Sequence, residues 1–147
     1  MSQAAHIDEK SRMREGNLTD PRYQAFEILH WGFVAAPLLA GADKFSNLLT
    51  HWENYLAPVF ARLSPFAPHT TMQVVGVVEI VAALLVAVRP RLGAYVVAAW
   101  LCGIILNLLL LGNYYDVALR DLGLALGALA LGRLSETYGH KPGPSAR

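Results

Sequence analysis

Charge is scarce in this chain of 147 residues, because Asp, Glu, Lys and Arg together make up only 16% of it. A soluble domain of this size usually carries about 25% charged residues. The formal net charge of +1 gives no sign of the basic surface that nucleic-acid-binding proteins need. Hydrophobic residues reach 54%. The composition therefore favours a membrane protein over the alternative, a very apolar soluble helical bundle.

Cysteine and clustered metal ligands are scarce as well. Cys102 is the single cysteine, which excludes an internal disulfide and the CxxC chemistry of membrane thiol oxidases. The sequence has no HExxH motif and no repeated carboxylate–histidine pair, so we expect no metal site. His30 is the single histidine inside an apolar stretch, which argues against a haem held by two histidines. We expect no covalently bound cofactor.

Long apolar stretches dominate what is present. Hydrocarbon about 30 Å thick needs roughly 20 residues of helix, and residues 26–42, 70–88, 92–111 and 117–134 all come close to that length. Backbone polar groups inside lipid must be satisfied within the chain, so such segments form helices. The sequence predicts an all-α fold: an integral membrane, antiparallel four-helix bundle in one domain over residues 23–135.

The basic residues predict the orientation of these spans. On the outer side only Lys44 and Arg62 are basic, whereas most of the others fall on the opposite side. These are Lys10, Arg12, Arg14, Arg22, Arg89, Arg91, Arg133, Lys141 and Arg147. Because basic residues mark the cytoplasmic side, we expect both termini in the cytoplasm. Residues 1–22, which do not resemble a signal peptide, and 136–147 are predicted to be cytoplasmic tails, the first of them disordered.

The connection between the first two spans is long and contains apolar residues at helical spacing. We expect residues 46–63 to form an extra amphipathic helix on the outer surface of the membrane. Two roles are open for this helix. It either caps the bundle or forms a lid over a ligand site that opens outward.

Several residues within the spans are costly in lipid, since a charge near the bilayer centre costs at least about 2.5–3.5 kcal/mol and usually faces a partner inside the bundle. Glu79 lies near the middle of the second span. Every span also contributes a polar residue to the outer half of the bundle. These residues are Lys44, Gln73, Asn107, Arg120 and Asp121.

Two interpretations of these residues are open. They are either ion pairs and hydrogen bonds that orient the helices, or the walls of a functional pocket. We expect Arg120 to reach inward to Glu79, the natural deep acceptor for it. A buried ion pair is weak evidence for stability alone, because desolvation offsets its attraction. A membrane carboxylate beside an arginine suits binding of a quinone head group, relay of a proton or binding of an anion.

Four short motifs follow one another in a recognisable order. They are GADKF at residues 41–45, GVVE at 76–79, VRPRLGA at 88–94 and ALRDL at 118–122. Their order and spacing resemble the DoxX family of small four-helix membrane proteins of bacteria and archaea, over roughly residues 25–135. The motif positions match at Gly41, Lys44, Gly76, Glu79 and Arg120. The chain departs from the family in its longer polar N-terminal tail and its aromatic-rich outer link.

The resemblance implies a function in a bacterial or archaeal plasma membrane. Some members of the family or close relatives are subunits of quinone-linked oxidoreductases, including thiosulfate:quinone oxidoreductase, whereas many have no known activity. It therefore implies the membrane subunit of such a complex, but the family supplies no settled set of catalytic residues. In such a subunit we expect Glu79 to be the catalytic residue that passes the proton. The residues expected to bind the quinone are Lys44, Gln73, Asn107, Arg120 and Asp121.

Alternatives to that function remain open. The chain has no redox centre of its own, so electron transfer needs a bound quinone or a partner that carries a cofactor. A non-catalytic membrane anchor or assembly partner of another complex is the main alternative, and a protein partner or a homo-oligomer is expected in either case. Transport of a small solute is a weaker third hypothesis, because no inverted repeat or broken helix pair is evident.

Overall fold

The computed structural model describes Ile7 and residues 18–139, and all regular structure in these residues is helical. The elements are α2 (Pro21–Asp43), η1 (Trp52–Tyr55), α3 (Pro58–Leu63), α4 (Pro68–Val88), α5 (Pro90–Leu111) and α6 (Tyr115–Tyr138). The all-α prediction is confirmed. The predicted tails lie largely outside the described residues.

The long helices begin and end at residues that favour such boundaries. The side chain of Asp20 accepts a hydrogen bond from the backbone N–H of Arg22 at 2.9 Å, and Pro21 occupies the first turn of α2. Prolines open α4 and α5 in the same way. Gly112 ends α5 in the left-handed conformation, with φ of 73°, which glycine adopts without steric cost.

Three of the described helices, α2, α4 and α5, are long and apolar enough to cross a bilayer. Helix α4 also leaves a row of large apolar side chains exposed, namely Val77, Val81, Leu84 and Val88. Their spacing puts them on one face of the helix. A contiguous exposed apolar face of this kind suits contact with lipid. These features indicate a membrane protein.

Helix α6 does not belong to that group, although it contains the fourth predicted span. It carries Arg120 and Asp121 near one end and Arg133 and Glu136 near the other, which lowers its apolar character. It nevertheless forms the most extensive helix–helix contact in the protein, along α5. The fourth membrane crossing therefore stays a prediction.

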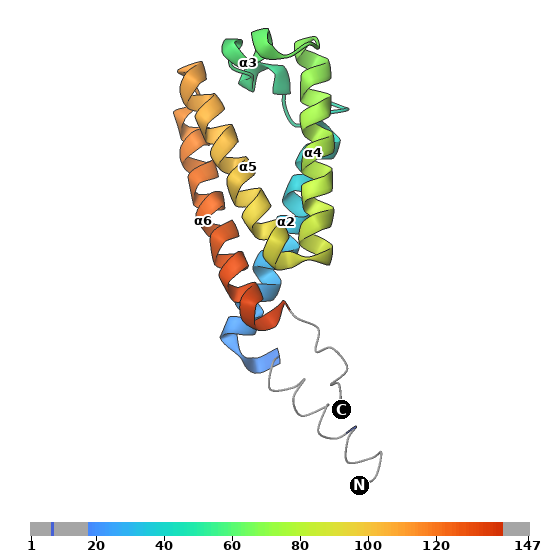
Figure 1. Cartoon of the computed structure of the whole chain (residues 1–147), viewed down its shortest axis with the longest axis vertical. Coiled ribbons are helices and arrows are strands. Elements are labelled where there is room, and N and C mark those ends of the chain that lie inside the picture. Colours follow the sequence, from blue (N-terminus) through green and yellow to red (C-terminus); the bar gives the residue numbers. More distant parts are fainter. Residues whose placement is uncertain (1–6, 8–17, 140–147) are drawn as a thin grey trace.

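The four long helices pack in a ring, in which α2 contacts α4, α4 contacts α5, α5 contacts α6 and α6 contacts α2 (Figure 1). The elements η1 and α3 lie at one end of the helices, which we call the link end. The start of α2 and the end of α6 lie at the other, the tail end. There the hydroxyl of Tyr138 donates to Asp20 Oδ2 at 2.8 Å, joining the two ends of the chain's folded part.

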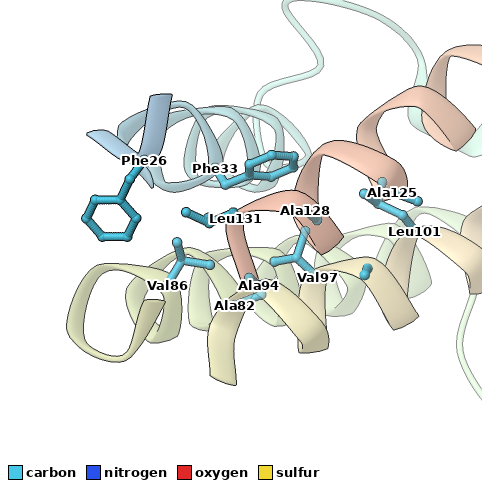
Figure 2. Packing of buried hydrophobic residues seen from close by; sticks show 11 residues of the cluster. Phe26, Phe33, Ala82, Val86, Ala94, Val97, Leu101, Ala125, Ala128 and Leu131 are labelled. Carbon is cyan, nitrogen blue, oxygen red and sulfur yellow. The ribbon is translucent and has the colours of Figure 1, made fainter. Parts of the chain in front are cut away.

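The apolar core fills the tail half of the ring. Figure 2 shows side chains from all four long helices meeting there, including Phe33 of α2, Val86 of α4, Val97 of α5 and Leu131 of α6. Alanines occupy much of the remaining contact surface of α5 and α6. Their small side chains let these two helices approach closely.

The predicted continuous helix over residues 46–63 is wrong, because the link forms η1 and α3 with a break between them. Pro58 explains the break, since a proline disfavours helical conformation in the residue before it, and Ala57 is extended. Nearer α2, Asn47 has a positive φ of 51°. The carboxylate of Asp43 accepts the backbone N–H groups of Leu48 and Leu49, which fixes this part of the link to the end of α2.

Candidate functional site

Two glycines bring α2 and α4 into backbone contact in the link half of the ring. A Cβ atom added to Gly41 would lie 2.6 Å from the carbonyl oxygen of Gly76. A Cβ atom added to Gly76 would lie 2.6 Å from the carbonyl oxygen of Gly41. Any side chain would push the helices apart, so only glycine permits this approach.

Each of these glycines leaves room for a charged side chain of the other helix. The position of a Cβ on Gly76 lies 3.1 Å from Cβ of Lys44, and that on Gly41 lies 3.2 Å from Cβ of Glu79. Residues three apart share a helix face, and side chains lean toward the helix N-terminus. In antiparallel helices these two directions converge. The glycine contact therefore brings Lys44 and Glu79 together.

Lys44 and Glu79 form a buried ion pair. Lys44 Nζ lies 2.6 Å from Glu79 Oε2, and the two side chains are only 4% and 9% exposed. The ammonium also donates to the carbonyl of Ala40 at 3.4 Å. The ring of Trp52 covers it, with its centroid 3.7 Å from Nζ, a cation–π contact. The lysine is thus enclosed on several sides.

Helices α5 and α6 complete this polar site. Asp121 of α6 is buried and close enough to Lys44 and Glu79 for their charges to interact. Trp100 Nε1 of α5 is buried and directs its N–H toward the Glu79 carboxylate, but the contact does not reach full hydrogen-bond geometry. We call Lys44, Glu79, Trp100 and Asp121 the buried charge cluster. All four long helices contribute to it.

The prediction that Arg120 reaches inward to Glu79 is wrong. The Arg120 side chain is 69% exposed, and its Nε lies 3.9 Å from the carboxylate of Asp121. Adjacent residues point about 100° apart around a helix, so Arg120 and Asp121 cannot both face the interior. Asp121 takes the inward position, and Lys44 is the ion-pair partner of Glu79.

Two other predicted site residues lie away from the cluster. The Asn107 amide donates to the carbonyl of Tyr55 at 2.6 Å and accepts the N–H of Ala57 at 2.9 Å. It thereby fixes the break between η1 and α3 to helix α5. Gln73 Nε2 lies 3.2 Å from His69 Nε2 at an exposed position. Both residues hold the link end rather than line the buried charge cluster.

Asp43 positions the tryptophan that covers Lys44. Its carboxylate accepts a hydrogen bond from Trp52 Nε1 at 2.8 Å, besides those from the link backbone. Sequence reasoning missed this role of Trp52 and also the presence of Trp100 in the site. Their N–H groups were the available signal, because a buried indole usually finds a hydrogen-bond partner.

A groove of about 400 Å³ runs between α4 and α5 and reaches Trp100. Its other lining residues are aliphatic: Val78, Val81, Ala82, Leu85, Val96 and Ala99. The groove therefore presents an apolar surface on two membrane-capable helices and ends at Trp100, whose N–H is buried on the side of Glu79 and is not open to the groove. Ligand sites commonly combine a mostly apolar lining with a few polar groups.

No cluster of metal-ligating side chains is found among residues 18–139 or at Ile7. Comparison of the chain with models of protein families, with curated proteins and with solved structures gives no match. The resemblance to the DoxX family therefore stays a prediction that rests on the motifs themselves. The structure gives two of those motifs a physical role, since their glycines and charges form the contact between α2 and α4.

Proposed function

We propose that this chain is the membrane subunit of a quinone-linked oxidoreductase in a bacterial or archaeal plasma membrane. In this proposal α6 is the fourth membrane crossing and both termini are cytoplasmic. The observation that carries the proposal is the buried charge cluster, where an ion pair, a second carboxylate and an indole N–H without a full hydrogen bond meet beside an apolar groove.

The groove and the cluster suit the two parts of a quinone. An isoprenoid tail matches the aliphatic lining between α4 and α5. A quinone carbonyl oxygen is a hydrogen-bond acceptor, and Trp100 Nε1 is a donor that makes no full hydrogen bond in the described part of the chain. The proposal requires the indole to turn from Glu79 toward the groove. An unsatisfied buried donor costs about 1–3 kcal/mol, which a ligand acceptor would recover.

Reduction of a quinone to a quinol takes two electrons and two protons. The electrons come from a partner subunit that carries a redox cofactor, because the chain's own residues supply none. Both protons would come from water, one of them by way of Glu79, whose carboxylate is fixed in position by Lys44. Each of the two carboxylates has a cation near it, Lys44 at 2.6 Å from Glu79 and the exposed Arg120 at 3.9 Å from Asp121.

A second candidate function is a non-catalytic membrane anchor for another complex. The observation that favours it is that Lys44 has its partners within the chain. Its ammonium already contacts Glu79, the ring of Trp52 and the carbonyl of Ala40. Asn107 likewise uses both of its amide groups to hold the link. On this hypothesis the polar groups fix the helices in register for a partner protein.

Native mass spectrometry of the full chain, extracted gently from its own membranes, tests the proposal. We expect a stoichiometric isoprenoid quinone that is lost in Glu79→Gln and in Trp100→Phe, while each variant keeps its helix content. The matched control is Glu136→Gln, which makes the same change at a partly exposed position at the tail end. It should retain the quinone.

Other outcomes of this experiment count against the proposal. A bound protein partner without quinone supports the anchor function instead. A variant that loses its partner and its fold together assigns the ion pair to packing. A bare monomer or homo-oligomer contradicts both functions.

A further inference from the structure

The turn between α4 and α5 is tight and held by a backbone contact. Arg89 is the single residue between the two helices. A Cβ atom added to Gly93 would lie 2.5 Å from Cα and from N of Val86, so the helices touch directly after the turn. This contact fixes Arg89 and Arg91 at the same level, at the tail end of two membrane-capable helices.

A pocket of about 450 Å³ lies between this turn and the end of α6. Arg89, Arg91 and Tyr95 provide its polar side, and Val88 and Leu92 provide exposed aliphatic surface beside them. The ring of Tyr95 packs against Gly132 of α6. Its hydroxyl makes no hydrogen bond to the described residues, so it is available to a ligand.

The pocket has an excess of positive charge. No carboxylate of the described residues lies within 4.0 Å of Arg89. Arg91 lies 3.5 Å from Glu136 Oε1, but the same oxygen accepts a shorter contact from Arg133 at 3.0 Å. Two guanidinium groups of the pocket therefore share, at most, one carboxylate that already has a partner.

This combination of groups matches one class of molecule. Guanidinium groups bind phosphate through paired hydrogen bonds, and the aliphatic surface of Val88 and Leu92 suits acyl chains. Basic pockets between helices at a membrane boundary attract anionic lipid headgroups. A soluble phosphate would use the charges but not the apolar side of the pocket.

We propose that the pocket at the α4–α5 turn binds the phosphate of an anionic phospholipid, through Arg89, Arg91 and the Tyr95 hydroxyl. The acyl chains lie along Val88 and Leu92. This site is separate from the buried charge cluster, and it requires only that α4 and α5 lie in a bilayer. It therefore stands or falls independently of quinone binding.

Titration of the detergent-solubilised full chain with phosphatidylglycerol and with phosphatidylcholine, followed by native mass spectrometry, tests this site. We expect preferential binding of phosphatidylglycerol. Loss of two charges near a membrane surface predicts a roughly tenfold to thirtyfold weaker affinity in the double variant Arg89→Gln/Arg91→Gln. Arg62→Gln is the matched control, because Arg62 is exposed on α3 at the link end. It should leave the affinity unchanged.

Three results would overturn the proposal. Equal affinity for the two lipids, or equal affinity of the wild type and the double variant, removes the headgroup site. Displacement of phosphatidylglycerol by millimolar inorganic phosphate assigns the pocket to a free anion instead. Should the double variant fail to fold by circular dichroism, Tyr95→Phe provides the same comparison, with an expected loss of a few-fold.

Discussion

The two halves of the helix ring are held together by different means. In the tail half, Phe33, Val86 and Leu131 form an apolar core, with neutral hydrogen-bonding groups at its edge such as His30 Nε2, 3.0 Å from the carbonyl oxygen of Val86. In the link half, Gly41 and Gly76 let the backbones touch, and the contact carries charges. Both halves depend on close approach of helices. They differ in how much unfolding free energy is lost when one side chain is removed.

Lipid as the solvent explains why this difference matters. Apolar packing between membrane helices gains little from the hydrophobic effect, because lipid tails are as apolar as the side chains they replace. An unpaired charge in the same place is costly. The link half therefore specifies which helix faces which, while the tail half fills the space between them.

The largest expected effect comes from removing one partner of the ion pair. Glu79→Ala leaves the buried Lys44 ammonium without its carboxylate, which we expect to lower the free energy of unfolding by about 3–5 kcal/mol. Replacing both residues together, as Lys44→Met/Glu79→Leu, should recover part of that loss, because both charges of the ion pair are removed. The buried carboxylate of Asp121 then keeps Arg120 as its nearby cation, at 3.9 Å. Unfolding in mixed micelles followed by circular dichroism measures both. Equal losses in the single and double variants would contradict this account.

The glycine contact gives the next largest effect. Gly76→Ala places a Cβ atom 2.6 Å from a backbone oxygen that cannot move alone, and we expect a loss of about 1–3 kcal/mol from overpacking. Gly103→Ala is the control, since nothing lies within 4 Å of an added Cβ there. That change should be neutral or stabilising by up to about 1 kcal/mol, from helix propensity. Similar losses at both sites would show that the backbone contact is not tight.

A truncation in the tail half should cost less than removal of the buried carboxylate. Leu131 is fully buried, so Leu131→Ala leaves a cavity in the apolar core. In soluble proteins, such a change in the core lowers the free energy of unfolding by about 2–5 kcal/mol. We expect about 2 kcal/mol here, because moving a leucine side chain from lipid into the core gains less free energy than moving it from water. A loss larger than that of Glu79→Ala, in the same unfolding assay, would reverse the comparison between the halves.

The smallest effect concerns an exposed pair at the link end. A hydrogen bond from His69 at 2.6 Å lowers the pKa of Glu53 from its ordinary value of 4.5 to about 2. A lowered pKa stabilises the fold fully above about pH 4.5, and this stability is lost as the pH falls through about 2. Exposure keeps the contribution small. Melting curves at several pH values between 5 and 2 should fall more steeply for the wild type than for Glu53→Gln; parallel curves would argue against the pair.

Local sequence determined the helices and their boundaries. Apolar stretches of membrane length predicted α2, α4 and α5 to within a few residues at most ends. The start of α2 likewise follows local chemistry, since Asp20 caps it and Pro21 occupies its first turn. These features depend on the chain's own neighbours, which is why they can be deduced from a pattern. The link was predictable only in part, because the break before Pro58 was overlooked.

Which residues form the buried charge cluster could be learned only from the tertiary structure. The sequence identified Lys44 and Asp121 as polar residues of the outer half and Glu79 as a residue near the middle of its span, but it paired Glu79 with Arg120 and omitted Trp100. The depth of a residue in the membrane can be deduced from its position along the span. The direction in which its side chain points depends on how the helix is rotated about its axis. That rotation is set by contacts such as Gly41 against Gly76, between residues far apart in the chain.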